Sequence, residues 1–310
     1  MNEVFVGELI RKRRKELHLT QEELSNGICE ASTLSRIENK RQTPTRNVLN
    51  ALLARLGLSD ERFYAAVTSE ELKINKLFIE ITNYNVEYEK TSKEEREVVK
   101  LKLLKKHAEL QKIMDEDDNV SKQFLIRSQV IISDWSIEDK IKKLIEAMRL
   151  TKPNFELEEV KSGIFTFDEI KIIHLIAVSY AEGNNSEMAI EIWRKLLHNI
   201  EHRFEEISPA RAQKDLILFG LARELLIIKN YECAWKYAEE GRELAVHCTI
   251  YQHLPGFIII LGECEYQFGN LNKSEYLFKQ AYYLCESIGD KANRKLIYDG
   301  YLDYFGKEIS

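Results

Sequence analysis

The sequence predicts an all-α protein of two domains, and three observations support this. The chain has 310 residues, about twice the length of a typical domain. Only 13 glycines and 4 prolines interrupt it, whereas leucine, isoleucine, glutamate and lysine abound. Apolar side chains recur three and four residues apart along most of the chain. We therefore expect a small N-terminal helical domain followed by a larger helical region.

Charge and composition exclude several protein classes. The formal net charge is −6, but residues 1–62 carry a net charge of +2. A basic N-terminal part beside an acidic remainder suits contact of the first part alone with a polyanion. No run of 18 apolar residues is present, and the first residues lack the pattern of a secretion signal. We therefore expect a cytoplasmic protein with no membrane partner.

The cysteines give no sign of a metal site. None forms a C-x-x-C pair, and no histidine lies at the spacing of a zinc ligand. We therefore expect no metal and no other cofactor. An odd number of cysteines without a secretion signal indicates reduced thiols, which we expect to fill space in the core. They are Cys29, Cys233, Cys248, Cys264 and Cys285.

The first expected helix runs from Val4 to Leu17. Its apolar side chains recur at helical spacing, and its other side carries the basic run from Arg11 to Lys15. Most such runs are only solvated helix faces. Beside a DNA-binding element, however, some of these side chains would lie within reach of phosphate groups.

A capping box predicts the second helix. Thr20 is a natural N-cap, and Glu23, three residues later, completes the box. The helix then spans Gln21 to Ser25. It ends at Asn26-Gly27, because both residues tolerate the left-handed backbone that a tight corner requires.

The third helix presents small or hydrogen-bonding side chains on its outer face. Leu34 and Ile37 are three residues apart and share a face, which we expect to be buried. A helix of this kind after a tight corner suits the major groove of DNA, which admits one helix with short side chains. By spacing alone, an ordinary helical hairpin remains an alternative. The outward positions are Ala31, Ser32, Thr33, Ser35 and Arg36.

This stretch resembles the helix-turn-helix of phage repressors of the Cro/cI type. The recurrent fragments of that family stand here as Leu19-Thr-Gln-Glu-Glu-Leu-Ser25 and Ser32-Thr-Leu-Ser-Arg-Ile-Glu38. The resemblance implies that the outward positions of the third helix read bases, with Arg36 able to pair with guanine. The family usually has glycine where this chain has Lys40, which could change the backbone of the loop. The phosphate contacts that the resemblance implies are Gln21, Asn39, Lys40, Arg41 and Arg46.

Two more helices complete the expected N-terminal domain. Apolar residues from Val48 to Leu56 mark a fourth helix, which Gly57 ends, and residues 60–66 suggest a fifth. The resemblance implies a five-helix repressor-type domain. We expect this domain to span residues 1–67, with a linker at about 66–72, and a second domain to span residues 68–310.

The second domain repeats a pattern of small residues. After a degenerate helix pair in residues 70–118, a small residue begins a register whose positions +3, +12, +16 and +19 hold mostly small or apolar residues. The pattern is clearest from Ala177, Ala222 and Gly262, and weaker from Ser128. It resembles the tetratricopeptide repeat. We therefore expect a superhelix of five helical hairpins with a terminal helix near residues 292–305.

Stacked hairpins of this kind line a groove with their first helices. The repeat register places cations, amides and aromatic rings there, a mixture suited to a short peptide with a free carboxylate. Each of these side chains also has an ordinary role as a packing or surface group. The groove candidates are Gln129, Lys171, His174, Phe219, Arg223, Glu263, Tyr266 and Gln267.

The combination resembles the PlcR-like and Rgg-like peptide-pheromone regulators of Gram-positive bacteria. The resemblance covers the whole chain and is strongest in residues 24–38, with a second likeness in residues 147–155. It implies a quorum-sensing transcription regulator that binds a DNA operator as a homodimer and is switched by a signalling peptide. PlcR-like grooves grip the peptide with asparagines, and this chain is apolar near Phe219 and Ile259.

Two other functions are alternatives to this one. The repeats could serve only dimerisation or the binding of another protein, in a repressor that needs no ligand. An enzyme is not expected, because the chain has no phosphate-binding glycine loop, nucleophile elbow or H-E-x-x-H motif.

Overall fold

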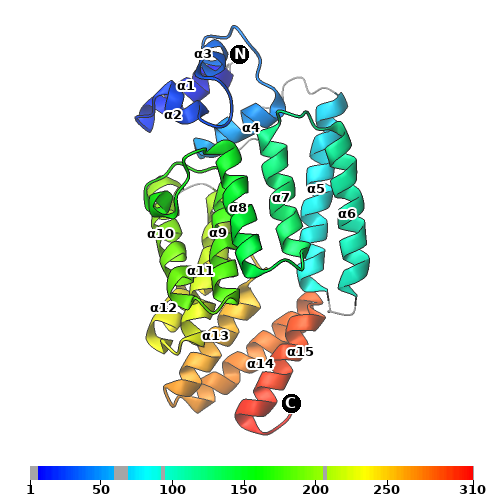
Figure 1. Cartoon of the computed structure of the whole chain (residues 1–310). Helices are drawn as coiled ribbons and strands as arrows, with labels where there is room; N and C mark the ends of the chain where they lie inside the picture. The colour runs from blue at the N-terminus through cyan, green and yellow to red at the C-terminus, as the bar shows by residue number, and fades with distance from the viewer. Residues whose placement is uncertain (1–5, 59–68, 92–94, 205–207, 310) are drawn as a thin grey trace, which may run out of the picture. The chain divides into compact units, whose positions relative to one another are not determined.

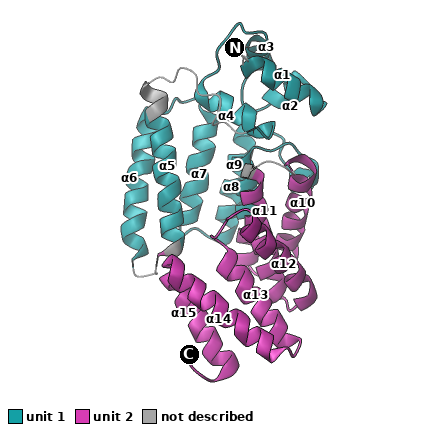
Figure 2. Ribbon diagram, turned by 180° about the vertical axis from the view of Figure 1, so that it is seen from behind, with its two compact units in different colours: residues 1–89, 94–176, 206–209 teal, residues 90–93, 177–205, 210–310 magenta. Residues whose placement is uncertain are grey.

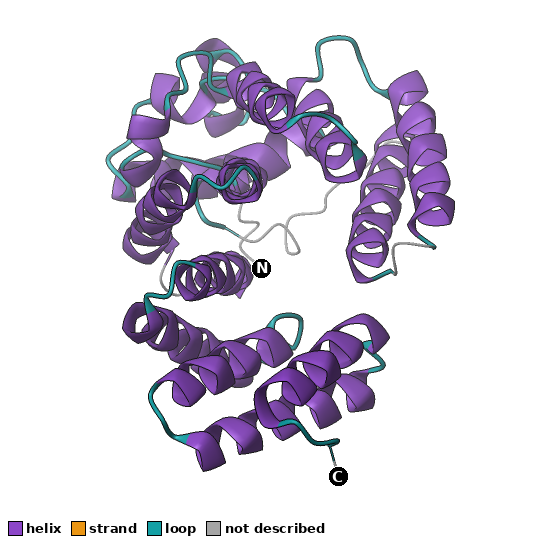
Figure 3. Ribbon diagram, turned by 60° about the horizontal axis from the view of Figure 1, so that its bottom comes forward, coloured by secondary structure: helices purple, strands orange, loops and turns teal. Residues whose placement is uncertain are grey.

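The structure is a computed structural model that describes residues 6–58, 69–91, 95–204 and 208–309. Figure 1 and Figure 3 show only helices and loops in these ranges, as expected for an all-α chain. None of the helices described has both the length and the apolar content of a transmembrane span. The helices are α1 (Val6–Glu16), α2 (Gln21–Ser25), α3 (Ala31–Glu38), α4 (Arg46–Arg55), α5 (Ser69–Lys90), α6 (Arg96–Ile113), α7 (Asn119–Ile132), α8 (Ile137–Thr151), the 3-10 helix η1 (Leu157–Lys161), α9 (Phe167–Glu182), α10 (Ser186–Phe204), α11 (Ser208–Ile227), α12 (Tyr231–His247), α13 (Leu254–Gln267), α14 (Leu271–Ile288) and α15 (Lys291–Phe305).

Helices α1 to α4 form the N-terminal head. The predicted capping box is present, since the side chain of Thr20 accepts from the backbone N–H of Glu23 and the Glu23 carboxylate accepts from that of Thr20. The predicted fifth helix lies outside the described residues. The leucines and isoleucines at the predicted spacing form one buried cluster: Ile10, Leu24, Leu34, Ile37, Leu52, Leu53 and Leu56.

Four corners of the head have left-handed backbone, the first at His18 with φ +55°. Gly27 has φ +73° and Gly57 has φ +69°, where glycine was expected to end α2 and α4. Lys40 has φ +62°, so it adopts the conformation that glycine favours rather than a different loop. The Lys40 ammonium lies 2.6 Å from the carboxylate of Glu8, in an exposed ion pair.

The predicted helix pairs and terminal helix are present in the body. Helices α5 to α14 follow one another at the places of the five expected hairpins, and α15 closes the chain. The predicted register is visible in α13 and α14, where Ser274 Oγ donates to the carbonyl of Gly262 at 2.7 Å. A Cβ on Gly241 would overlap the ring of Phe257. Small residues are therefore required because neighbouring helices approach closely there.

The chain divides into two compact units by its internal contacts. Figure 2 colours unit 1, residues 1–89, 94–176 and 206–209, apart from unit 2, residues 90–93, 177–205 and 210–310. Unit 1 thus holds the head together with α5 to α8 and the first part of α9. The sequence-based division near residue 67 stays a prediction, because residues 59–68 are not described.

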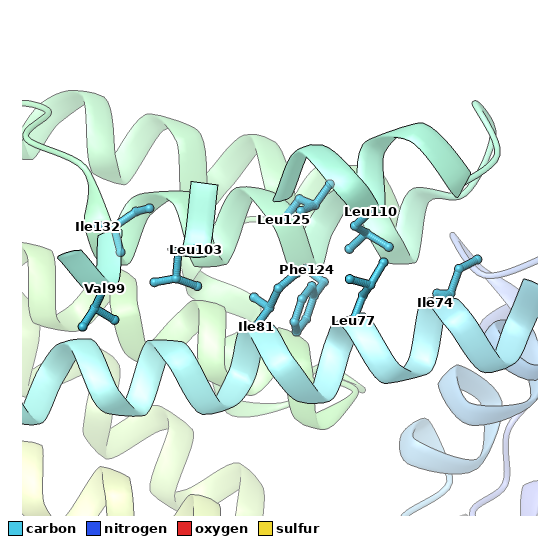
Figure 4. Close-up of a cluster of buried hydrophobic side chains, with 9 residues drawn as sticks. All are labelled: Ile74, Leu77, Ile81, Val99, Leu103, Leu110, Phe124, Leu125 and Ile132. Carbon is cyan, nitrogen blue, oxygen red and sulfur yellow. The ribbon is translucent and has the colours of Figure 1, made fainter. Parts of the chain in front are cut away.

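An apolar cluster holds α5, α6 and α7 together in unit 1. Figure 4 shows side chains from the three helices meeting along the length of α5. The ring of Phe78 stacks on that of Phe124, with centroids 4.3 Å apart. The cluster comprises Ile74, Leu77, Ile81, Val99, Leu103, Leu110, Phe124, Leu125 and Ile132.

A buried polar chain lies among the same three helices. Ser128 Oγ donates to the amide oxygen of Asn85 at 2.9 Å, so its oxygen accepts from His107 Nε2 at 2.8 Å. The His107 ring is 2% exposed, and its Nδ1 has no partner among the described residues. Burial lowers the pKa of His107 to about 4.

His107 makes the stability of unit 1 depend on pH. Its neutral form is favoured in the folded state, so its contribution is complete above the unfolded pKa of about 6.5. That contribution falls by up to about 3 kcal/mol as the pH drops through 6.5 toward 4. Urea unfolding at several pH values should show a steeper loss of stability for the wild type than for His107→Gln. Equal slopes would contradict the buried neutral state.

Replacing Lys40 by glycine should stabilise the head. The left-handed backbone costs a side-chain-bearing residue about 1 kcal/mol, and the exposed pair with Glu8 offsets less than that. We expect Lys40→Gly to raise the urea midpoint. Asn184→Gly is the matched control with φ +58° in the wild type, and its gain should be smaller because asparagine tolerates this region. A lower urea midpoint for Lys40→Gly than for the wild type would show that the backbone at Lys40 is not strained.

Candidate functional site

The predicted reading helix presents its polar face to solvent. In α3, Leu34 and Ile37 are buried in the head core, whereas Ser32 and Arg36 are exposed. Ala31, Thr33 and Ser35 are half-buried on the flanks. No bulky apolar side chain projects from the outer face of α3. The backbone can therefore approach a flat polar surface closely, as the floor of a DNA groove requires.

Glu38 fixes α3 relative to the two helices before it. Its carboxylate, 1% exposed, accepts from Arg14 Nε at 2.6 Å and from Arg14 Nη2 at 2.8 Å. It also accepts from Gln21 Nε2 at 2.8 Å. Arg14 Nη1 donates in turn to the carbonyl of Leu19 at 2.8 Å. Glu38, the last residue of the predicted motif, thus connects α1, α2 and α3 in the interior of the head and is not placed to contact DNA.

The predicted phosphate contacts differ in how free they are. Gln21 gives one amide hydrogen to Glu38, and the backbone N–H of Glu23 in the same first turn already donates to Thr20 Oγ1. Asn39 Nδ2 donates to the carbonyl of Ser35 at 2.8 Å, which caps α3. Arg41 is exposed and Arg46 is half-buried at the start of α4. The base and phosphate assignments stay predictions.

A second buried network joins α2 and α4 of the head to α8 and α9. The guanidinium of Arg55 donates to the carbonyls of Leu24, at 3.1 Å, and Asn26, at 2.6 Å. It also donates to Glu169 Oε1 at 3.1 Å, and both side chains of this ion pair are 0% exposed. A Cβ on Gly27 would overlap the backbone of Thr151. Head and body are therefore in direct contact at the corner after α2.

The groove candidates of unit 1 lie near a charged cluster. Lys171 Nζ is 3.4 Å from Asp168 Oδ1, and Arg127 Nη2 is 3.4 Å from the same atom. Burial alone would raise the pKa of Asp168, but the two cations outweigh it and lower that pKa. Gln129 is half-buried, and His174 is 8% exposed.

The candidates of unit 2 lie on α11 and α13. Phe219 stacks on the ring of His253, with centroids 4.8 Å apart, and Arg223 is exposed. Glu263 accepts from the hydroxyl of Tyr304 at 3.2 Å, and burial raises the pKa of Glu263. The Tyr266 ring packs on that of Tyr304 at 4.7 Å, and Gln267 is exposed. Glu263 and Tyr266 thus both contact α15.

Sequence reasoning missed Arg127 and Asp168. Arg127 is two residues from Gln129, and Asp168 is three residues from Lys171, both of which the register places in the groove. Their pairing depends on the packing of α7 against α9, which repeat spacing alone does not give. The only available signal was local, since Asp168 and Lys171 are three residues apart and meet on one helical face.

Comparisons with known proteins agree with this architecture. A helix-turn-helix family model matches residues 10–63. A comparison with curated protein sequences gave no match. The fold is similar to that of Bacillus thuringiensis PlcR, solved with the peptide PapR7 and DNA, with a TM-score of 0.60 and 18% identity over 94% of this chain and 98% of that one.

Other solved structures share the fold over nearly their full length. ComR from S. thermophilus, solved with DNA and its signalling peptide ComS, has a TM-score of 0.54 and 14% identity over 96% of this chain and 99% of that one. Apo PlcR from B. thuringiensis has a TM-score of 0.53 and 17% identity, covering 95% and 98% of the two chains. Residues 10–63 therefore form a helix-turn-helix domain, and the chain has the fold of the PlcR and ComR regulators.

Proposed function

We propose that this chain is a sequence-specific DNA-binding transcription regulator of the cytoplasm, which acts as a homodimer and is switched by a short signalling peptide. The observation that carries the proposal is the exposed polar face of α3 on a rigid helix-turn-helix, in a chain with the PlcR and ComR fold. PlcR and ComR were each solved with DNA and a peptide, which supports both ligands here.

The head supplies the DNA-binding chemistry. Ser32 and Arg36 are the exposed groups of α3 and would contact base edges, Arg36 as a bidentate donor to guanine. Arg41 and the N–H groups at the start of α2 would hold phosphates on either side. Because Glu38 fixes α3 on α1 and α2, these groups would reach DNA without a change in the head.

The repeats supply the peptide site. In unit 1, Arg127 and Lys171 share one carboxylate, Asp168, so the cluster carries one uncompensated positive charge. A terminal carboxylate or acidic side chain of a peptide would bind there. In unit 2, exposed Arg223 and Gln267 and the ring of Phe219 offer polar and aromatic contacts.

A ligand-independent repressor is the second candidate. The apolar surroundings of Phe219, where PlcR-like grooves carry asparagines, favour it. Both candidates are transcription regulators rather than enzymes.

The first test concerns base reading. Selection of random duplexes by the purified chain should yield one operator motif. Arg36→Ala should flatten the preference at one base pair, losing about 1–3 kcal/mol of discrimination. The matched variant Arg41→Ala should weaken binding to all sequences alike and reduce the salt dependence. An unchanged base profile for Arg36→Ala would contradict the assignment.

The second test concerns the peptide. A library of synthetic heptapeptides with free carboxyl termini, and the same library amidated, is added to the chain on its selected operator. We expect only the first to shift operator affinity, and we expect Lys171→Glu with Arg223→Glu to abolish the shift while sparing operator binding.

Lys142→Glu with Arg211→Glu is the control for that variant, because it changes the net charge equally at exposed positions of α8 and α11. Its response should match the wild type. No shift with either library would favour the ligand-independent repressor, and an intact response in the first variant would reject the groove assignment.

A further inference from the structure

Two polar networks connect α7 and α9 within unit 1. One lies at the proposed peptide site, and the other reaches the head. The first is the charged cluster at the proposed peptide site, where Asp168 of α9 faces Arg127 of α7. Arg127 Nε is buried and has no hydrogen-bond partner among the described residues, so the guanidinium is only partly paired by Asp168. Both contacts of Asp168, with Arg127 and Lys171, are long at 3.4 Å, and Asp168 is 45% exposed. A competing anion can therefore reach this cluster.

The second network ends in the head. Gln123 of α7 donates to Thr151 Oγ1 at 2.7 Å, and Thr151 donates to Glu169 Oε1 at 2.6 Å. Arg55 of the head donates to the same oxygen at 3.1 Å. All of these donors and acceptors are buried, and each hydroxyl or amide has a consistent direction of donation. The network is therefore well ordered, and Glu169 cannot move without changing the position of Arg55.

The residues of the two networks are neighbours on both helices. Gln123 and Arg127 are four residues apart and lie on one face of α7. Asp168 and Glu169 are consecutive residues in the first turn of α9. That turn begins with a capping box, because Glu169 Oε2 accepts from the backbone N–H of Thr166 at 2.7 Å and Thr166 Oγ1 accepts from that of Glu169 at 3.2 Å. A change at Asp168 therefore acts on a turn whose other carboxylate holds the head.

We infer that the first turn of α9 couples the proposed peptide site to the DNA-binding head. An anionic group bound by Arg127 and Lys171 takes the place of Asp168. The released turn shifts Glu169, and Arg55 transmits the shift to the carbonyls at the end of α2. This inference rests on the proposed function for the nature of the anion, a peptide carboxylate. The coupling itself is a property of the chain alone.

Hydrogen–deuterium exchange of the full-length chain tests the coupling without peptide or operator. Asp168→Asn removes the charge that holds the turn and keeps its shape. We expect it to speed amide exchange in residues 21–28 and 46–56 by about threefold or more, with residues 137–147 of α8 unchanged. Glu156→Gln, which breaks the exposed ion pair with Arg149, is the control and should leave the head unchanged.

The order of the two networks is tested by combining variants. Glu169→Gln alone should also speed exchange in the head, and Asp168→Asn should add nothing to it, because the path is already cut. If Asp168→Asn does not fold, Lys171→Gln replaces it in the test. Lys171 is the half-buried partner of Asp168, so its loss weakens the same cluster. It too should speed exchange in residues 21–28.

Two results would overturn the inference: unchanged exchange of the head in the folded Asp168 or Lys171 variants, or independent effects of Asp168→Asn and Glu169→Gln that multiply. Because neither ligand is used, a failure of the heptapeptide test would reject the peptide and leave this result interpretable.

Discussion

The ion pair between Arg55 and Glu169 is the constraint on which the arrangement of unit 1 depends. Both side chains are fully buried, so their removal from water costs several kcal/mol per ion. The cost is offset in part because most of the other hydrogen-bonding groups have partners, namely two head carbonyls, Thr151 and the Thr166 N–H, whereas Arg55 Nε has none among the described residues. Such a pair adds little net stability but tolerates only one geometry. The head is therefore held in one position on α8 and α9.

The same physical solution recurs inside the head. Glu38 is buried and its charge is matched by the fork of Arg14, with Gln21 as third donor. A bidentate pair of this kind fixes angle as well as distance. Each network fixes a different orientation. Glu38 fixes α3 relative to α1 and α2, and Glu169 fixes the head relative to α8 and α9. The outer face of α3 takes no part in either network, so it can vary with little effect on the framework.

Local chemistry made most of the head predictable. The limits of α2 follow from Thr20, Glu23 and Gly27, and the buried side of α3 follows from Leu34 and Ile37. The repeat register predicted the small residues Gly262 and Ser274, which touch. Lys40 was harder to predict, because it adopts left-handed backbone, the conformation of the glycine that the family usually has there, although lysine does not favour it.

The candidate sites were less predictable because their partners are far apart in the chain. Arg55 and Glu169 are 114 residues apart, and each by itself has the pattern of a solvated helical charge. Gly27 was assigned to a corner, yet it also lies against Thr151, which no local rule indicates. Arg127 and Asp168 meet only because α7 and α9 pack together. Repeat spacing finds positions that face a groove, but it does not find which charges neutralise each other there.

The buried carboxylate of Glu169 lies next to the partly exposed carboxylate of Asp168. This arrangement allows the fold to respond to a ligand without a flexible segment. The Asp168 contacts are long, and the side chains of Asp168 and Lys171 are partly exposed, whereas the contacts of Glu169 are shorter and buried. The first set is weak because its contacts are long and partly exposed, so an incoming anion can replace it, while the second set resists any change other than a movement of the whole turn. Asp168 and Glu169 are consecutive in the chain. Replacement of the weak Asp168 contacts by an anion therefore acts on the buried hydrogen bonds of Glu169. Weak contacts of Asp168 at the ligand site and strong contacts of Glu169 at the head together allow ligand binding to displace the head.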